Sequence, residues 1–150
     1  MDNKLEAKIS AEVIRIDKLL SDSGLLFEIC AAREPDFIKL SAAALTLHSF
    51  YNGLENIILL IVKNIDDAAE QDLQWHKFLF EQAFKANAKR TMVFRADLKE
   101  RLEGYLYFRH FIRHSYGSEL DWDRLKPLVE EVQKVWDIVK ADLDSFKQNN

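Results

Sequence analysis

A dense group of polar side chains interrupts an apolar stretch of the sequence near residue 110. The run from Arg109 to Tyr116 reads Arg-His-Phe-Ile-Arg-His-Ser-Tyr. At 100° per residue, and relative to Arg109, a helix would place Arg113 at roughly 40°, His110 at roughly 100°, His114 at roughly 140° and Tyr116 at roughly −20°. A guanidinium group grips phosphate oxygens with two hydrogen bonds, and imidazole titrates near neutral pH. The pattern therefore suggests a site in which Arg109 clamps a phosphate and His114 acts as a general acid or base.

Two other interpretations of this cluster stay open on spacing alone. His110 and His114 are four residues apart and could be metal ligands, but a zinc protease would need a glutamate after the first histidine, and Phe111 stands there. No third ligand is evident, so we expect no metal and no other cofactor. A purely structural interpretation has the two histidines capping a helix end while Arg109 pairs with a carboxylate.

The phase of the cluster indicates which way it faces. Arg109 and Tyr116 are in phase with the apolar residues Leu102 and Ile112, so we expect the cluster to turn partly inward or toward a partner chain. The two remaining histidines give less indication of a functional role. His48 and His76 are expected to be packing or surface residues, and Trp122 and Trp136 core or interface residues.

Composition predicts one compact all-α domain over residues 1–150. The 150 residues are 48% hydrophobic and 31% charged, with only 4 Gly and 2 Pro, which disfavours both a turn-rich β-fold and a disordered chain. The apolar periodicity predicts about five antiparallel helices. We expect a first helix over residues 3–30 that frays or bends near Ser23-Gly24, and a central, most buried helix from Phe37 to about Asn64, capped by Asp36.

Three further helices complete the expected bundle. A shorter aromatic helix is predicted over residues 72–89, followed by a loop near residues 90–94. The fourth helix, from Phe94 to Tyr116, should carry the polar cluster and be closed by Gly117 in the left-handed conformation. The last helix should begin near Asp121, tolerate Pro127 close to its start, and leave residues 148–150 as a frayed tail.

The charge distribution limits the class of ligand. The net charge is −4, but residues 85–126 hold 10 Lys/Arg against 6 Asp/Glu, while the rest of the chain holds 11 against 19. A local basic region on an acidic body permits a site for one or two phosphates and disfavours a protein that coats long duplexes. The single cysteine, Cys30, fits a reducing cytoplasm. We see no signal peptide, and the longest apolar run, Ile57–Val62, is too short to span a membrane.

The same residues carry a resemblance to a known family. The run from Arg109 to Tyr116 resembles the R-x4-H motif of HEPN-domain ribonucleases, and its extension to Tyr116 resembles the H-x-Y of the HepT toxin branch. Three more segments occur in the same order in HepT-like domains: residues 47–57, Trp75-His76 and residues 119–122. Together the four segments span residues 47–122 of the 150.

This resemblance implies a fold, an assembly and an activity. HEPN domains are all-helical and dimerise, so that the motifs of two subunits form one cleft. The implied activity is metal-independent RNA cleavage, in which the 2′-hydroxyl attacks the adjacent phosphate, His114 shuttles protons and Arg109 stabilises the transition state. His110 and Arg113 would support catalysis or contact phosphate, and DNA should be inert.

The resemblance also implies a regulatory partner. HepT-like toxins are typically encoded beside a minimal nucleotidyltransferase antitoxin, which in this family can transfer AMP to the motif tyrosine, here Tyr116. Two alternatives remain open. The chain could be a non-catalytic HEPN module that binds RNA or serves as the partner subunit of a nucleotidyltransferase. It could also be a structural helical dimer, which full pairing of Arg109 inside one subunit would favour.

Overall fold

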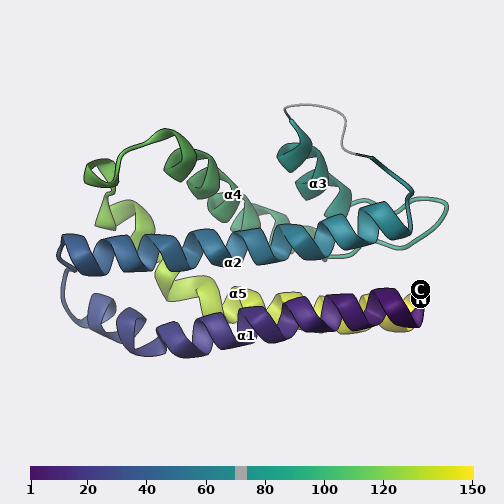
Figure 1. The fold of residues 1–150 in the computed structure, drawn as a ribbon, viewed down its shortest axis with the longest axis horizontal. Helices are drawn as coiled ribbons and strands as arrows, with labels where there is room; N and C mark the ends of the chain where they lie inside the picture. Colours follow the sequence, from purple (N-terminus) through teal and green to yellow (C-terminus); the bar gives the residue numbers. More distant parts are fainter. Residues whose placement is uncertain (70–73) are drawn as a thin grey trace.

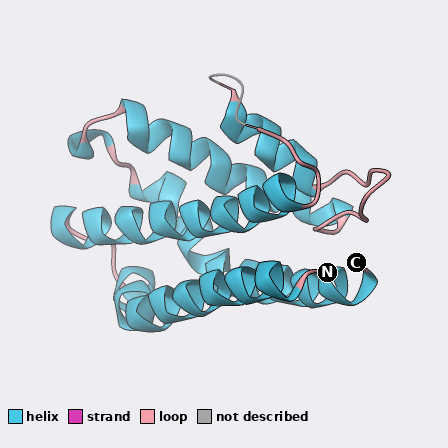
Figure 2. Cartoon of the chain, turned by 45° about the vertical axis from the view of Figure 1, so that its right-hand side comes forward, coloured by secondary structure: helices cyan, strands magenta, loops and turns pink. Residues whose placement is uncertain are grey.

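The computed structural model describes residues 1–69 and 74–150, which form five α-helices and two short 3₁₀-helices (Figure 1). In chain order these are α1 (Asn3–Ala32), α2 (Phe37–Asn64), α3 (Trp75–Ala83), η1 (Ala96–Leu98), α4 (Lys99–His114), η2 (Gly117–Glu119) and α5 (Trp122–Asn149). The described residues contain no strand (Figure 2), only an isolated bridge between Asn87 and Arg90. The predicted all-α bundle is confirmed.

Helix α2 forms the centre of the bundle. Helices α1 and α5 lie on one side of it, and α3 and α4 lie on the other (Figure 1). Helix α1 runs antiparallel to both α2 and α5, and the two chain ends meet, with the Met1 amino group donating a 2.6 Å hydrogen bond to the Asn150 carbonyl. As predicted, α2 is the most buried helix, because the four other α-helices pack around it and its apolar side chains share one hydrophobic core with them.

The three long helices begin where their local sequence predicts. Asp36 caps α2 by accepting a 2.9 Å hydrogen bond from the Lys39 amide, and Asp121 caps α5 by accepting one from the Asp123 amide. Pro127 lies early in α5, as expected. Two expectations of fraying are wrong. Helix α1 does not fray at Ser23-Gly24 but continues to Ala32. The end of the chain does not fray, because α5 reaches Asn149 and the Asn150 side chain bonds to Thr91.

The segment between α2 and α4 differs from the prediction. The expected start of the third helix at residue 72 lies outside the described residues, and the described helix ends at Ala83 rather than at residue 89. The amides of Val93 and Phe94 both bond to the Ala83 carbonyl, at 3.0 and 3.1 Å. The returning chain therefore takes the carbonyl that a longer helix would have used.

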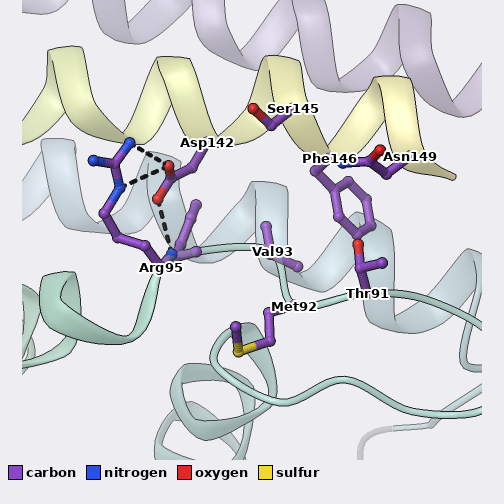
Figure 3. Close-up of a pocket in the computed structure, with 9 residues that line it drawn as sticks. Thr91, Met92, Val93, Arg95, Asp142, Ser145, Phe146 and Asn149 are labelled. Atoms are coloured by element: carbon purple, nitrogen blue, oxygen red, sulfur yellow. Dashed lines mark hydrogen bonds and ion pairs between the residues drawn. The ribbon is translucent and has the colours of Figure 1, made fainter.

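A buried arginine holds this returning loop. The Arg90 side chain is fully buried and bonds to both carboxylate oxygens of Asp66, at 2.9 and 2.8 Å. Its remaining donors bond to the carbonyls of Gln82, Lys85 and Thr91. A few residues later, Arg95 pairs with Asp142 of α5 at 2.7 Å and fixes the approach to α4 (Figure 3). These pairings explain why the loop is longer than the sequence suggests.

Helix α4 is shorter than predicted at both ends. It is preceded by the 3₁₀ turn η1, and it ends at His114, where Ser115 leaves the helix in an extended conformation. Gly117 does not close the helix, since no glycine in the described residues has a positive φ. It starts η2 instead, and the Glu119 carboxylate accepts a 3.2 Å hydrogen bond from the Tyr116 amide. Tyr116 therefore lies outside the helix.

Helix α2 is more apolar than its longest uninterrupted apolar run, Ile57–Val62, suggests. That run is too short to span a membrane, but by length and composition the whole helix is apolar enough to do so. However, 56% of its most apolar 18-residue stretch is buried inside the bundle. Burial of this kind is typical of the core helix of a soluble domain.

Candidate functional site

The last two turns of α4 separate the two principal motif residues. Arg109 is buried, with 8% of its surface exposed, whereas His110, Arg113 and His114 are exposed. Five helical residues rotate the direction of His114 from that of Arg109 by about 140°. The expectation that Arg109 faces inward is confirmed. One copy of the chain points the arginine into the bundle and the histidine toward solvent.

Arg109 meets a histidine and a carboxylate from two other helices. Its Nη2 lies 3.2 Å from Nε2 of His76 on α3, and its Nε lies 3.9 Å from Oε2 of Glu55 on α2. The contact with Glu55 is an ion pair, but its distance is too long for a hydrogen bond. Nε has no hydrogen-bond partner among the described residues, so Arg109 is not fully paired inside the subunit.

His76 and Glu55 also bond to each other, which the sequence alone did not reveal. Nδ1 of His76 lies 2.6 Å from Oε1 of Glu55, so the imidazole bridges the carboxylate and the guanidinium. His76 does lie at the surface, as expected, with 40% of its side chain exposed, but the expectation missed these two polar contacts. The sequence did contain one indication of this contact, because Glu55 is a charged residue within the apolar stripe of the central helix. A buried carboxylate of this kind requires a polar partner.

Two more residues of α2 face the same region. Nε2 of His48 accepts a 3.2 Å hydrogen bond from Nδ2 of Asn52, and Tyr51 is buried. Burial, followed by the positive charges of Arg109 and Arg113, lowers the pKa of His48 and favours its neutral form. Burial, followed by the negative charge of Glu55, raises the pKa of Tyr51. The positive charge of Arg109 therefore influences the pKa of both His48 and Tyr51.

Unsatisfied polar atoms concentrate around Arg109. Among the described residues, the buried side-chain atoms without a hydrogen-bond partner are His48 Nδ1, Tyr51 Oη, Glu55 Oε2 and Arg109 Nε. Each such group costs about 1–3 kcal/mol, and native proteins keep few of them. We call these residues together with His76 the Arg109 cluster. Polar groups left unbonded in one place are typical of a site that receives a polar ligand or water.

A groove of about 440 Å³ between α3 and α4 opens onto the Arg109 cluster. Arg109, His76 and His110 line it together with Lys77, Phe80 and Tyr107. Two carboxylates, Glu81 and Glu103, also line the groove, and Lys99 pairs with Glu81 at 3.0 Å, so charges of both signs lie beside the aromatic rings. The groove therefore brings together Arg109 and His110 of the predicted site residues.

The other predicted residues lie beyond this groove. The His114 ring packs 4.6 Å from the His110 ring, centroid to centroid, and so stands next to the groove without lining it. Arg113 is exposed on the same helix. Tyr116 is 81% exposed and follows the helix, so the expected helical phase between it and Arg109 is wrong, because α4 ends two residues earlier.

Two further observations concern other parts of the surface. No group of three His, Cys, Asp or Glu side chains within residues 1–69 and 74–150 is arranged to hold a metal ion.

A second hollow, of about 220 Å³, lies between the loop after α3 and the end of α5 (Figure 3). Its charged groups, Arg95 and Asp142, bond to each other, so it offers no free charge for a ligand.

A family model of known proteins matches most of the chain. Residues 42–150, well over half of the chain, match the family model described as HepT-like protein. The matched region contains α2 from Ala42 onward and all the later helices, and therefore the whole Arg109 cluster. No curated protein and no solved structure matches the chain. The chain belongs to the HepT-like family.

Proposed function

We propose that the protein is a metal-independent endoribonuclease, the toxin component of a HEPN/nucleotidyltransferase pair that acts in the cytoplasm. The observation that carries the proposal is the Arg109 cluster in a HepT-like chain. An arginine that is buried, incompletely bonded and five residues before an exposed histidine supports a phosphate-handling site better than a structural role. A structural arginine would have its hydrogen bonds satisfied, as Arg90 does.

The proposed reaction is an internal transesterification of RNA. His114 takes the proton of a ribose 2′-hydroxyl, and the resulting oxygen attacks the adjacent phosphorus. A new bond forms between the 2′-oxygen and phosphorus, while the bond from phosphorus to the 5′-oxygen of the next nucleotide breaks and that oxygen receives a proton from the His114 imidazole. The guanidinium of Arg109 stabilises the extra negative charge on the phosphate oxygens in the transition state. His110 and Arg113 lie on the same helix and would contact neighbouring phosphates.

The separation of the motif residues supports a two-subunit site. Because Arg109 and His114 point about 140° apart on one helix, a single chain does not direct both at one phosphate. In a homodimer, the histidine of one subunit can approach the arginine of the other. We propose that exposed apolar side chains at the corner between α1 and α2 form part of this interface: Leu25, Phe37, Ile38 and Leu45.

This surface adjoins the end of the motif. The Phe37 ring lies 3.6 Å from where a Cβ on Gly117 would be, directly after Tyr116. Ile38 and Leu45 are seven residues apart and so share one face of α2. An interface here would therefore bring the ends of the two α4 helices near each other.

We expect Leu45→Glu to convert the dimer into a monomer, because it places a charge in an apolar interface. Sedimentation velocity would measure the mass in solution. Ile14→Glu is the matched control, since Ile14 is 66% exposed and Leu45 is 64% exposed. Dimerisation of Leu45→Glu at wild-type strength would contradict this interface.

The function itself is tested with labelled RNA and DNA of the same sequence, incubated with the purified protein in EDTA. We expect cleavage of the RNA alone, because DNA lacks the attacking hydroxyl. The products should carry 2′,3′-cyclic phosphate ends, which mass spectrometry would identify. Failure of a folded dimer to cut a broad set of RNAs would favour the non-catalytic module that binds RNA or serves as a nucleotidyltransferase subunit.

Tyr116 is the proposed site of silencing by the nucleotidyltransferase partner. Its hydroxyl would attack the α-phosphate of ATP, lose its proton and release pyrophosphate, which leaves AMP on the ring. With 81% of its surface exposed, Tyr116 is accessible to a partner enzyme, and the added negative charge would compete with RNA phosphate. We expect mass spectrometry to find AMP on the wild type and none on Tyr116→Phe. AMP on a different residue would refute the assignment.

A further inference from the structure

His76 links Arg109 to a buried carboxylate, and the chemistry of the three groups fixes its tautomer. A guanidinium group has only donors, so Nε2 of His76 must accept the 3.2 Å hydrogen bond from Nη2 of Arg109. The ring proton is then on Nδ1, from which it donates the 2.6 Å hydrogen bond to Oε1 of Glu55. The result is a directed chain from guanidinium to neutral imidazole to carboxylate, across α4, α3 and α2.

We propose that His76, held by Glu55, is a positioning residue that sets the orientation of Arg109 for the transition state. This inference rests on the proposed RNA cleavage. The 3.9 Å ion pair with Glu55 stabilises the positive charge of Arg109 but does not fix the orientation of its guanidinium group. Nε of Arg109 has no hydrogen-bond partner among the described residues. The hydrogen bond to His76 therefore restrains the plane of the guanidinium group.

The contrast with the other buried arginine supports this role. Arg90 meets Asp66 directly through two short bonds, as a pair that only stabilises the fold would. At Arg109, the imidazole of His76 bridges the guanidinium group and the carboxylate of Glu55, and the side chain of His76 is 40% exposed. His76 also lines the groove that reaches Arg109 and His110. This arrangement leaves part of the guanidinium free for a substrate while one edge is held.

Two replacements of His76 separate positioning from packing. In His76→Gln the amide oxygen stands near the place of Nε2 and can still accept from Arg109. His76→Ala removes the acceptor. We expect His76→Ala to lower kcat for RNA cleavage about 10–100-fold, because a misplacement near 1 Å can cost that much. KM should change little, since the interaction strengthens in the transition state, and His76→Gln should keep most of kcat.

Phe78→Ala is the matched control for a general loosening of α3. Phe78 lies on the same helix and stacks on Trp75 at 5.2 Å, but it does not line the groove. We expect it to lower the thermal stability and leave kcat near the wild-type value. Equal losses of kcat in His76→Ala and Phe78→Ala, or wild-type kcat in His76→Ala, would overturn the positioning role.

Nitrogen-15 NMR tests the inference independently of cleavage. We expect His76 to be protonated at Nδ1, and the Arg109 Nε–H signal to shift in His76→Ala but much less in His76→Gln. A wild-type protein that cuts no RNA yet shows these signals would contradict the proposed function and leave the positioning geometry supported. A proton on Nε2 of His76 or an unmoved Arg109 signal would overturn the inference even in an active enzyme.

Discussion

Replacing His114 with alanine is expected to abolish RNA cleavage while leaving the fold and the dimer intact. His114 is exposed at the last turn of α4, so its removal costs no core packing. A general acid or base contributes about 10²–10⁴-fold to a rate, and a loss in that range is expected. The measurement is the initial rate of cleavage of a labelled RNA in EDTA, with circular dichroism and sedimentation of each variant.

Arg101→Ala is the control for loss of a polar side chain from α4. Arg101 is exposed in the first turns of that helix and does not line the groove, so we expect a wild-type rate. Arg109→Lys complements the experiment, because it keeps the charge but loses the planar fork, and we expect it to restore little activity. A His114→Ala protein that cuts RNA at the wild-type rate would remove His114 from the mechanism.

Replacing Arg90 with alanine is expected to cause the largest loss of stability. The change leaves Asp66, whose side chain is 12% exposed, without its counter-charge, and it frees the carbonyls of Gln82, Lys85 and Thr91. Removing one partner of a buried pair costs about 3–5 kcal/mol. Urea denaturation followed by circular dichroism would measure this loss as a lower midpoint at an unchanged slope.

Lys89→Ala provides an internal comparison one residue away. Lys89 pairs with Asp67 at 2.7 Å, but both side chains are largely exposed, and such pairs contribute less than about 1 kcal/mol. The free energy of unfolding should therefore separate the two variants clearly. Similar values for both would show that Arg90 does not fix the loop between α3 and α4.

The sequence by itself determined the parts of this protein that depend on local chemistry. Periodic apolar residues and capping aspartates predicted α1, α2 and α5, because helix formation and capping act over four residues. The order of the four resembling segments predicted the family, which the match over residues 42–150 confirms. The phase of Arg109 with Leu102 also predicted that the arginine faces inward.

Tertiary structure decided the features that join distant residues. Helix α3 ends at Ala83 because Arg90 and the returning chain take its carbonyls, and the pairing of Arg90 with Asp66 spans 24 residues. Glu55, His76 and Arg109 come from three helices, and the sequence singled out neither of the first two as a site residue. No local pattern encodes such a meeting, because the free energy of a buried charge depends on which partners the packing brings within hydrogen-bond distance.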